Sequence, residues 1–245
     1  MMAALFGLAL RQLMSRKSTI VLLLFAFLPV LLATVFRFGE STADPQRWTA
    51  TVLLAGLVVR LMLPVIALFL GTSVLGNEIE DGTAIYLLTK PTPRWQIIAA
   101  KLAAAWLMTI GLLLPPLVLA SQIALQGSGG SSIAPGFAVA VVAGALAYTT
   151  VFILTSLLTS RALVAGLAYV FIWEAVVSGI FTGTRVLSVR YLTLGIADAI
   201  VSSRPAVFDS NMDAVTSIAV LALATAALAG MAVRRLERFE LREPT

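Results

Sequence analysis

The sequence contains no cysteine and no histidine. Their absence excludes disulfide frameworks, thiol nucleophiles, zinc sites built from cysteine and histidine, and catalysis by a serine–histidine pair. Charge is also scarce, because only 12% of the 245 residues are charged, about half the share of an ordinary soluble domain. This composition excludes a soluble enzyme, a soluble nucleic-acid-binding domain and a disordered chain.

Hydrophobic side chains, by contrast, make up 60% of the chain, and its mean hydropathy is +0.99. Lipid must therefore be the solvent for most side chains. Six apolar runs are long enough to cross a hydrocarbon core of about 30 Å. They predict an all-α polytopic membrane protein with one transmembrane domain over residues 1–245. The expected spans are about 18–36, 50–76, 100–125, 136–159, 162–182 and 213–233.

The basic residues indicate how the chain is oriented. Eleven of them lie on the same side of the membrane as the N-terminus, five lie on the opposite side, and Arg60 lies within a span. By the positive-inside rule, both termini of this multi-pass protein are cytoplasmic. The excess of arginine over lysine indicates a bacterial genome rich in GC, and hence the cell (inner) membrane. The scatter of basic residues between apolar runs gives no nucleic-acid surface. On the N-terminal side are Arg11, Arg16, Lys17, Lys90, Arg94, Lys101, Arg161, Arg234, Arg235, Arg238 and Arg242.

Two segments outside the spans are also partly apolar. Residues 1–17 carry an apolar stripe, with Arg11 on the opposite side and Arg16 before the first span. They predict a helix in the cytoplasmic interface, although an extension of the first span would also fit. Residues 183–212 are too apolar for a free loop and too interrupted for a crossing, which predicts short re-entrant or interfacial helices before the sixth span.

The most informative segment lies between the second and third spans, at residues 77–96. Glu78, Glu80 and Asp81 stand just inside the membrane, and a short apolar run separates them from Arg94. Thr83 can cap a short helix whose positive N-terminal end the acids favour. A proline at the other end would stop that helix. The product is a short cytoplasmic helix with an apolar face, suited to a groove on a soluble partner.

At this segment the sequence resembles the permease subunit of type-2 ATP-binding cassette (ABC) transporters. The resemblance rests on an acid after the second span, Glu-x-x-x-Gly-Thr, a proline after an apolar stretch, and Arg-x-x-Ile-x-x-x-Lys at the start of the third span. These positions are Glu78, Gly82, Thr83, Pro91, Arg94, Ile97 and Lys101. The architecture of the whole chain fits the same family.

The resemblance implies an exporter whose permease dimerises and pairs with two cytoplasmic ATPase subunits. The segment after the second span would be the coupling helix that docks on the ATPase, and Glu78, Glu80, Asp81, Gly82, Thr83, Pro91 and Arg94 would belong to it. ATP and magnesium would bind the partner ATPase, so no cofactor or metal is expected on this chain. The nearest match to a phosphate loop, Gly71 to Gly76, continues with Asn77 and Glu78 where lysine and a hydroxyl residue are needed.

Two charges remain deep within spans, Arg60 in the second and Glu174 in the fifth. A charge at this depth is costly, so each should face protein or water. Their similar depths and opposite signs predict that they pair, or that both face one polar cavity, within or between protomers. Such a pair could line or gate the transport path, or serve as a structural bridge. Separate snorkelling of each side chain to the membrane surface is the remaining reading.

Two other classes of function fit the sequence less well than the exporter. An intramembrane enzyme would need a nucleophile with a base, or paired acids, whereas the spans offer a single acid, Glu174. A non-transporting membrane scaffold or an immunity-type protein would not need a short cytoplasmic helix flanked by acids. We therefore expect a membrane subunit that is not itself an enzyme, whose partners are the ATPase subunits, a second protomer and membrane lipids.

Overall fold

The computed structural model describes residues 2–14, 17–39, 42–80, 93–201, 208–210 and 212–237. All regular structure in these residues is helical. The elements include α1 (Met2–Met14), α4 (Pro45–Trp48), the π-helix η1 (Thr49–Met62), α9 (Ala162–Ala168), the π-helix η2 (Tyr169–Val177), α10 (Ser178–Ile180), the 3-10 helix η3 (Thr182–Leu187) and α11 (Val189–Val201). The others are α2 (Lys17–Ala26), α3 (Leu28–Phe38), α5 (Leu63–Glu80), α7 (Arg94–Leu125), α8 (Ile133–Leu158) and α12 (Ala214–Glu237).

Six continuous helical stretches are long and apolar enough to cross a membrane, which confirms the predicted all-α class with six spans. Pro29 at the start of α3 removes a backbone donor and separates α3 from α2 within the first of these spans. The six spans are Thr19–Phe38, Pro45–Gly76, Arg94–Leu125, Ile133–Leu158, Ala162–Ile180 and Ala214–Glu237.

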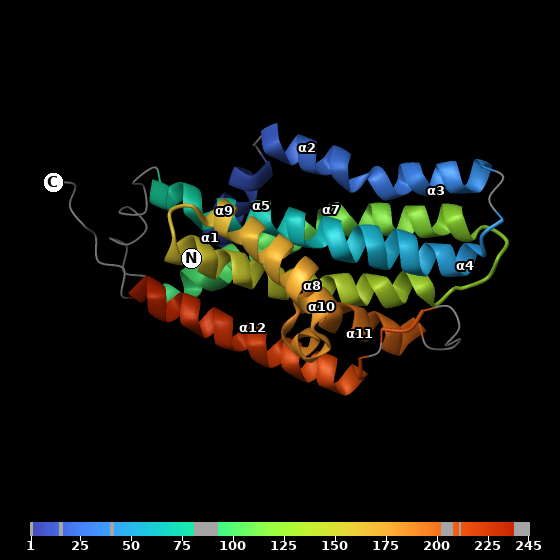
Figure 1. Cartoon of the computed structure of the whole chain (residues 1–245). Coiled ribbons are helices and arrows are strands. Elements are labelled where there is room, and N and C mark those ends of the chain that lie inside the picture. The colour runs from blue at the N-terminus through green and yellow to red at the C-terminus, as the bar shows by residue number, and fades with distance from the viewer. Residues whose placement is uncertain are drawn as a thin grey trace.

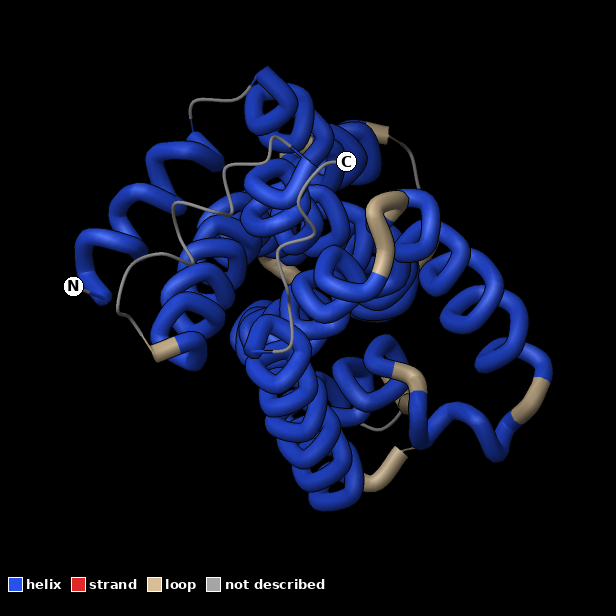
Figure 2. The backbone as a smooth tube through the Cα atoms, turned by 90° about the vertical axis from the view of Figure 1, so that its left-hand side faces the viewer, coloured by secondary structure: helices blue, strands red, loops and turns tan. Residues whose placement is uncertain are grey.

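The long helices lie side by side and give the bundle two distinct ends (Figure 1). At one end, here called the α1 end, lie α1 and the last turns of α5 and α12. The opposite end, the α4 end, carries α4 and the loop between α7 and α8. Figure 2 looks at the α1 end and shows α1 lying across the edge of the bundle rather than along it. This is the placement that an interfacial helix requires.

Helix α8 forms the centre of the bundle. It packs against α5, α7, α11 and α12, and Phe137, Tyr148 and Phe152 on it are completely buried. Its glycines allow close approach, because a Cβ atom at Gly144 would lie 2.5 Å from the Thr193 hydroxyl of α11. The burial of the two helices differs greatly: 67% of the most apolar part of the α8 span is buried, whereas for the α12 span the share is 11%. Much of the surface of α12 is therefore left for lipid or another protein.

Helix α11 lies beside half of α8 and runs in the opposite direction. Gly136, near the start of α8, lies against Val201 at the end of α11, and Gly144 lies against Thr193. The first turn of α11 is therefore level with the middle of α8, and its last turn is near the α4 end. This geometry places the N-terminus of α11 inside the bundle, close to the fifth span.

Candidate functional site

The carboxylate of Glu174 forms the centre of a buried polar cluster. Its side chain is only 2% exposed. One oxygen, Oε1, accepts hydrogen bonds from the Tyr169 hydroxyl at 3.0 Å and from the Val189 backbone N–H at 2.9 Å. The other, Oε2, accepts one from the Ser188 hydroxyl. Among the described residues, three neutral donors thus stabilise the carboxylate.

Two of these donors belong to the beginning of α11. Val189 is the first residue of this helix, and Ser188 caps it, because the Ser188 Oγ accepts a hydrogen bond from the Tyr191 backbone N–H at 3.4 Å. The first N–H groups of a helix lack partners within the helix, and its dipole favours a negative charge there. Glu174 therefore stabilises the N-terminus of α11 and holds it against the fifth span.

The hydroxyl of Tyr148 completes the cluster from α8. It is fully buried and close enough to the Glu174 carboxylate to interact with it electrostatically. The ring of Tyr148 stacks on Phe152, with centroids 6.0 Å apart, and Phe152 meets Tyr169 edge to face. The three rings position the two tyrosine hydroxyls from neighbouring helices. The Tyr148 hydroxyl therefore faces the same carboxylate as the Tyr169 hydroxyl.

Two arginines lie next to the cluster in the segment before the sixth span. The guanidinium groups of Arg185 and Arg190 lie 4.9 Å and 4.6 Å from the centroid of the Tyr191 ring. Arg190 is only 5% exposed, so its aliphatic stem and its charge are both held within the protein. Cation–π contacts of this kind fix the segment around the start of α11.

Glu174 and Arg60 both lie in π-helical stretches of their spans. In the fifth span, the Ser178 N–H and hydroxyl both contact the Trp173 carbonyl, the hydroxyl at 2.7 Å. In the second span, η1 ends where the Leu63 N–H bonds to the Val58 carbonyl, five residues earlier. π-helical turns inside helices occur frequently at functional sites.

The environment of Arg60 is the opposite of that of Glu174. Its side chain is exposed on the surface of the protomer, half-way along the helical stretch Pro45–Gly76. Within the part of the chain that the structure describes, Arg60 and Glu174 do not form the predicted pair, because the carboxylate is turned toward Tyr169, Ser188 and α11. Contact between protomers through these residues stays a prediction.

Of the residues expected to couple to an ATPase, the described ones, Glu78, Glu80 and Arg94, lie at the α1 end. Helix α5 continues through Glu78 and ends at Glu80, and α7 begins with a half-buried Arg94. Asp81, Gly82, Thr83 and Pro91 fall outside the described residues, as does most of the predicted coupling helix. Lys101, about two turns into α7, is almost completely buried. The described backbone thus brings both ends of the segment to one end of the bundle.

The structure describes only one of the two arginines assigned to the interfacial helix. Arg11 lies in the last turn of α1, and its side chain is exposed. Arg16 lies outside the described residues. Helix α1 packs mainly against α7, with Ala9 and Leu13 buried. Ala9 and Leu13 of the predicted apolar stripe therefore face the bundle, and Arg11 is exposed.

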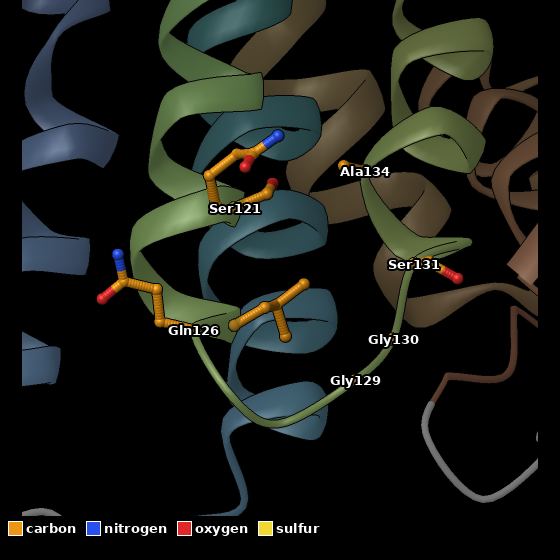
Figure 3. Close-up of a pocket in the computed structure, with 8 residues that line it drawn as sticks. Ser121, Gln126, Gly129, Gly130, Ser131 and Ala134 are labelled. Carbon is orange, nitrogen blue, oxygen red and sulfur yellow. The ribbon is translucent and has the colours of Figure 1, made fainter.

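A hollow of about 440 Å³ opens at the α4 end between α7, the following loop and α8 (Figure 3). Ser121 lines it, but the Ser121 hydroxyl already donates to the Leu117 carbonyl at 2.8 Å. Gln126 points away from the space between the two helices in Figure 3. The loop beside the hollow is shaped by Gly127, Gly129 and Gly130, whose positive φ angles favour glycine.

The fold and the buried cluster define a multi-pass membrane protein with polar groups held inside its helical bundle. A model of the ABC-2 family transporter proteins matches residues 14–189, which is more than half of the chain. The chain therefore belongs to the ABC-2 transporter family. No curated protein matches it. The family match extends from the end of α1 to Val189, and so includes Arg60, Glu174 and Ser188.

Sequence reasoning identified Glu174 but missed its partners. Ser188 and Val189 lie 14 and 15 residues further along the chain, and Tyr148 lies in another span. Their proximity depends on α11 turning back into the bundle, which the apolar character of residues 183–212 indicated only in outline. Tyr169 could have been suspected, because it lies about one helical turn before Glu174 on the same helix.

Proposed function

We propose that this chain is the membrane-spanning subunit of an ABC exporter, which forms the substrate path with a second copy of itself. Two separate cytoplasmic ATPase subunits, with ATP and magnesium bound to them, would drive the cycle. Membership of the ABC-2 family supports this proposal, because a membrane transporter subunit of this family works with an ATP-binding cassette partner. The protein would reside in the bacterial inner membrane with both termini in the cytoplasm.

The observation that carries the proposal is the arrangement at the α1 end. Helix α5 ends at Glu80 and α7 begins at Arg94 at this end, beside α1 and the last turns of α12 (Figure 1). Arg161 and Arg235 are also exposed there. An end rich in basic residues is the one expected to face the cytoplasm. Residues 81–92 join two central helices at this end, so a force applied to them would reach the bundle directly.

The exposed surface of the protomer supports a dimer. Arg60 is exposed half-way along the second span, where contact with hydrocarbon is costly. A second protomer, or a water-filled path between two protomers, would remove this contact. Homodimerisation is the simplest arrangement, since closed two-fold symmetry is the commonest form of assembly.

Co-purification with a soluble ATPase from the same genome tests the proposal. We expect the tagged permease to retain the ATPase through detergent extraction and to change its rate of ATP hydrolysis. Gly82→Pro should disrupt the coupling segment and reduce the retained ATPase by at least about tenfold, because proline removes a backbone donor and restricts the chain. Ser131→Ala, at the α4 end, is the matched control and should retain it fully.

Two results would contradict the proposal. One is a permease that neither retains nor stimulates any ATPase carrying a phosphate loop from its own genome. The other is full coupling by variants at both Glu78 and Gly82. The number of permease copies is measured in the same preparation by native mass spectrometry, and a single copy per complex would contradict the proposed dimer.

A further inference from the structure

The second span presents one surface stripe, and most of its other described side chains are buried. Most side chains of η1 and α5 are covered by other helices, and the positions that reach the surface recur about every four residues. This spacing keeps them on one side of a helix. Along the stripe lie Val52, Gly56, Arg60, Val65, Phe69 and Ser73, and the exposed Leu61 and the partly exposed Thr51, Ala55 and Leu57 lie beside them. This surface is mostly apolar, with Arg60 in its middle and Ser73 near the α1 end.

Among the residues that the structure describes, no acid pairs with Arg60 on this stripe. Between the ends of the six spans the sequence contains one acidic residue, Glu174. Its carboxylate is buried and accepts three hydrogen bonds from other groups. A second copy of the chain would carry the same buried carboxylate and a second exposed arginine. Two guanidinium groups in a medium of low dielectric would attract an anion from outside the protein.

The stripe ends in a second basic site at the α1 end. Ser73 lines a hollow of about 270 Å³ together with Thr72, Ser160 and Arg161. Arg161 is exposed and stands directly before the first residue of α9. The hollow is slightly smaller than typical pockets for drug-sized ligands, and suits a small charged group. Ser73 is 13 residues from Arg60, which corresponds to about 20 Å along a helix.

We propose that this stripe binds an anionic amphiphile. This inference assigns a substrate class to the exporter and rests on the proposed function. The acidic group of the substrate occupies the hollow at Arg161 first and then reaches Arg60. Its apolar chain lies along Val65 and Phe69. A phosphate, sulfate or carboxylate group satisfies the guanidinium through charge-assisted hydrogen bonds, while a neutral or cationic amphiphile of the same length does not.

Binding to the purified permease tests this proposal without any ATPase. The full chain is placed in nanodiscs of zwitterionic lipid and titrated with radiolabelled dodecyl phosphate, with empty nanodiscs as the blank. Dodecyltrimethylammonium serves as the competitor of opposite charge. We expect Arg60→Gln to weaken binding of dodecyl phosphate by at least about tenfold, because loss of one partner of a desolvated charge pair is costly. Arg60→Lys should weaken it by about threefold or less.

Two further variants make the test specific. Arg161→Gln should also weaken binding of dodecyl phosphate. If Arg60→Gln does not fold, Arg161→Gln and Arg60→Lys are the variants compared with the wild type. Arg37→Gln removes an exposed arginine from the first span and should leave binding unchanged. Dodecyltrimethylammonium should not displace the phosphate.

The proposal is overturned if Arg60→Gln and Arg161→Gln both bind dodecyl phosphate as the wild type does. It is also overturned if Arg60→Gln changes the ratio of monomer to dimer while binding stays the same, because the stripe would then be a contact between protomers. Since no ATPase is present, these results are independent of whether the permease couples to one.

Discussion

The two charges within the spans differ in how far the protomer itself satisfies them. Glu174 is buried and receives hydrogen bonds from two segments, whereas Arg60 lies exposed on the second span. A buried charge with a full set of partners is part of the folded structure of one chain. An exposed charge at the same depth becomes stable only when something outside the chain covers it. The first region should therefore govern folding, and the second should govern contacts with other molecules.

Removing the carboxylate should have the largest effect on the folded protomer. Glu174→Ala leaves the Tyr169 hydroxyl, the Ser188 hydroxyl and the Val189 N–H without their acceptor. We expect a loss of about 3 kcal/mol in the free energy of unfolding, since each buried unsatisfied group costs about 1–3 kcal/mol. Thermal unfolding in detergent measures this loss.

A labelling experiment shows whether α11 is then released. The chain has no cysteine of its own, so Thr193→Cys introduces a single thiol at a position that is completely buried in α11. In the Glu174→Ala background it should react with a maleimide at least about tenfold faster. Equal reaction rates would show that Glu174 does not hold α11. Exchange of the two charges, Arg60→Glu with Glu174→Arg, should not restore stability.

Disturbing the close packing of α11 on α8 should have the next largest effect on the free energy of unfolding. In Gly144→Ala the new methyl group would lie 2.5 Å from the Thr193 hydroxyl and 3.0 Å from Leu63 Cδ2. We expect a destabilisation of about 1–3 kcal/mol, as is typical of overpacked sites. Gly111→Ala is the matched control, because nothing lies within 4 Å of the added atom, and it should be neutral or slightly stabilising. Equal unfolding midpoints for the two variants would contradict the packing.

A smaller effect depends on pH and lies outside the spans. Asp213 caps α12, and hydrogen bonds from the Thr216 backbone N–H and hydroxyl lower the pKa of its carboxyl. The stabilisation is therefore complete above the unfolded pKa of about 4 and is lost as the pH falls through the lower folded value. The difference in unfolding midpoint between wild type and Asp213→Ala should shrink between pH 7 and pH 3. A difference that stays constant with pH would contradict this capping role.

The smallest effect on the free energy of unfolding is expected at Arg60. Arg60→Gln should change the stability of the isolated protomer by less than about 0.5 kcal/mol, as is usual for exposed positions. Unfolding of the monomer in detergent checks this. A loss as large as that of Glu174→Ala would remove the distinction between the two regions, and would mean that the protomer itself uses the arginine.

The fold was predictable because the apolar runs are long and the charges few. A run of about twenty apolar residues permits only a membrane-spanning helix, so the number and class of the spans followed from the sequence. The path of α11 did not, because it depends on tertiary contacts such as Gly136 with Val201 and Gly144 with Thr193. The periodicity of apolar residues also did not predict the π-helical stretches around Arg60 and Glu174.

The candidate site was predictable only in part, and for the same reason. Depth along a span indicated that Arg60 and Glu174 were unusual, but it gave no information on which side of the helix each one faces. Pairing by depth and sign overlooked neutral donors, although the Tyr169 and Ser188 hydroxyls and the Val189 N–H are sufficient for a carboxylate. Buried charges are satisfied by whatever donors the fold supplies, and these need not carry charge.

The loop between α7 and α8 limits where the molecule can move. The Gln46 side chain of α4 donates a hydrogen bond to the Ser128 carbonyl of this loop. This contact links the second span to the connection between the third and fourth spans at the α4 end. We expect any opening of that face during a transport cycle to begin by breaking this hydrogen bond.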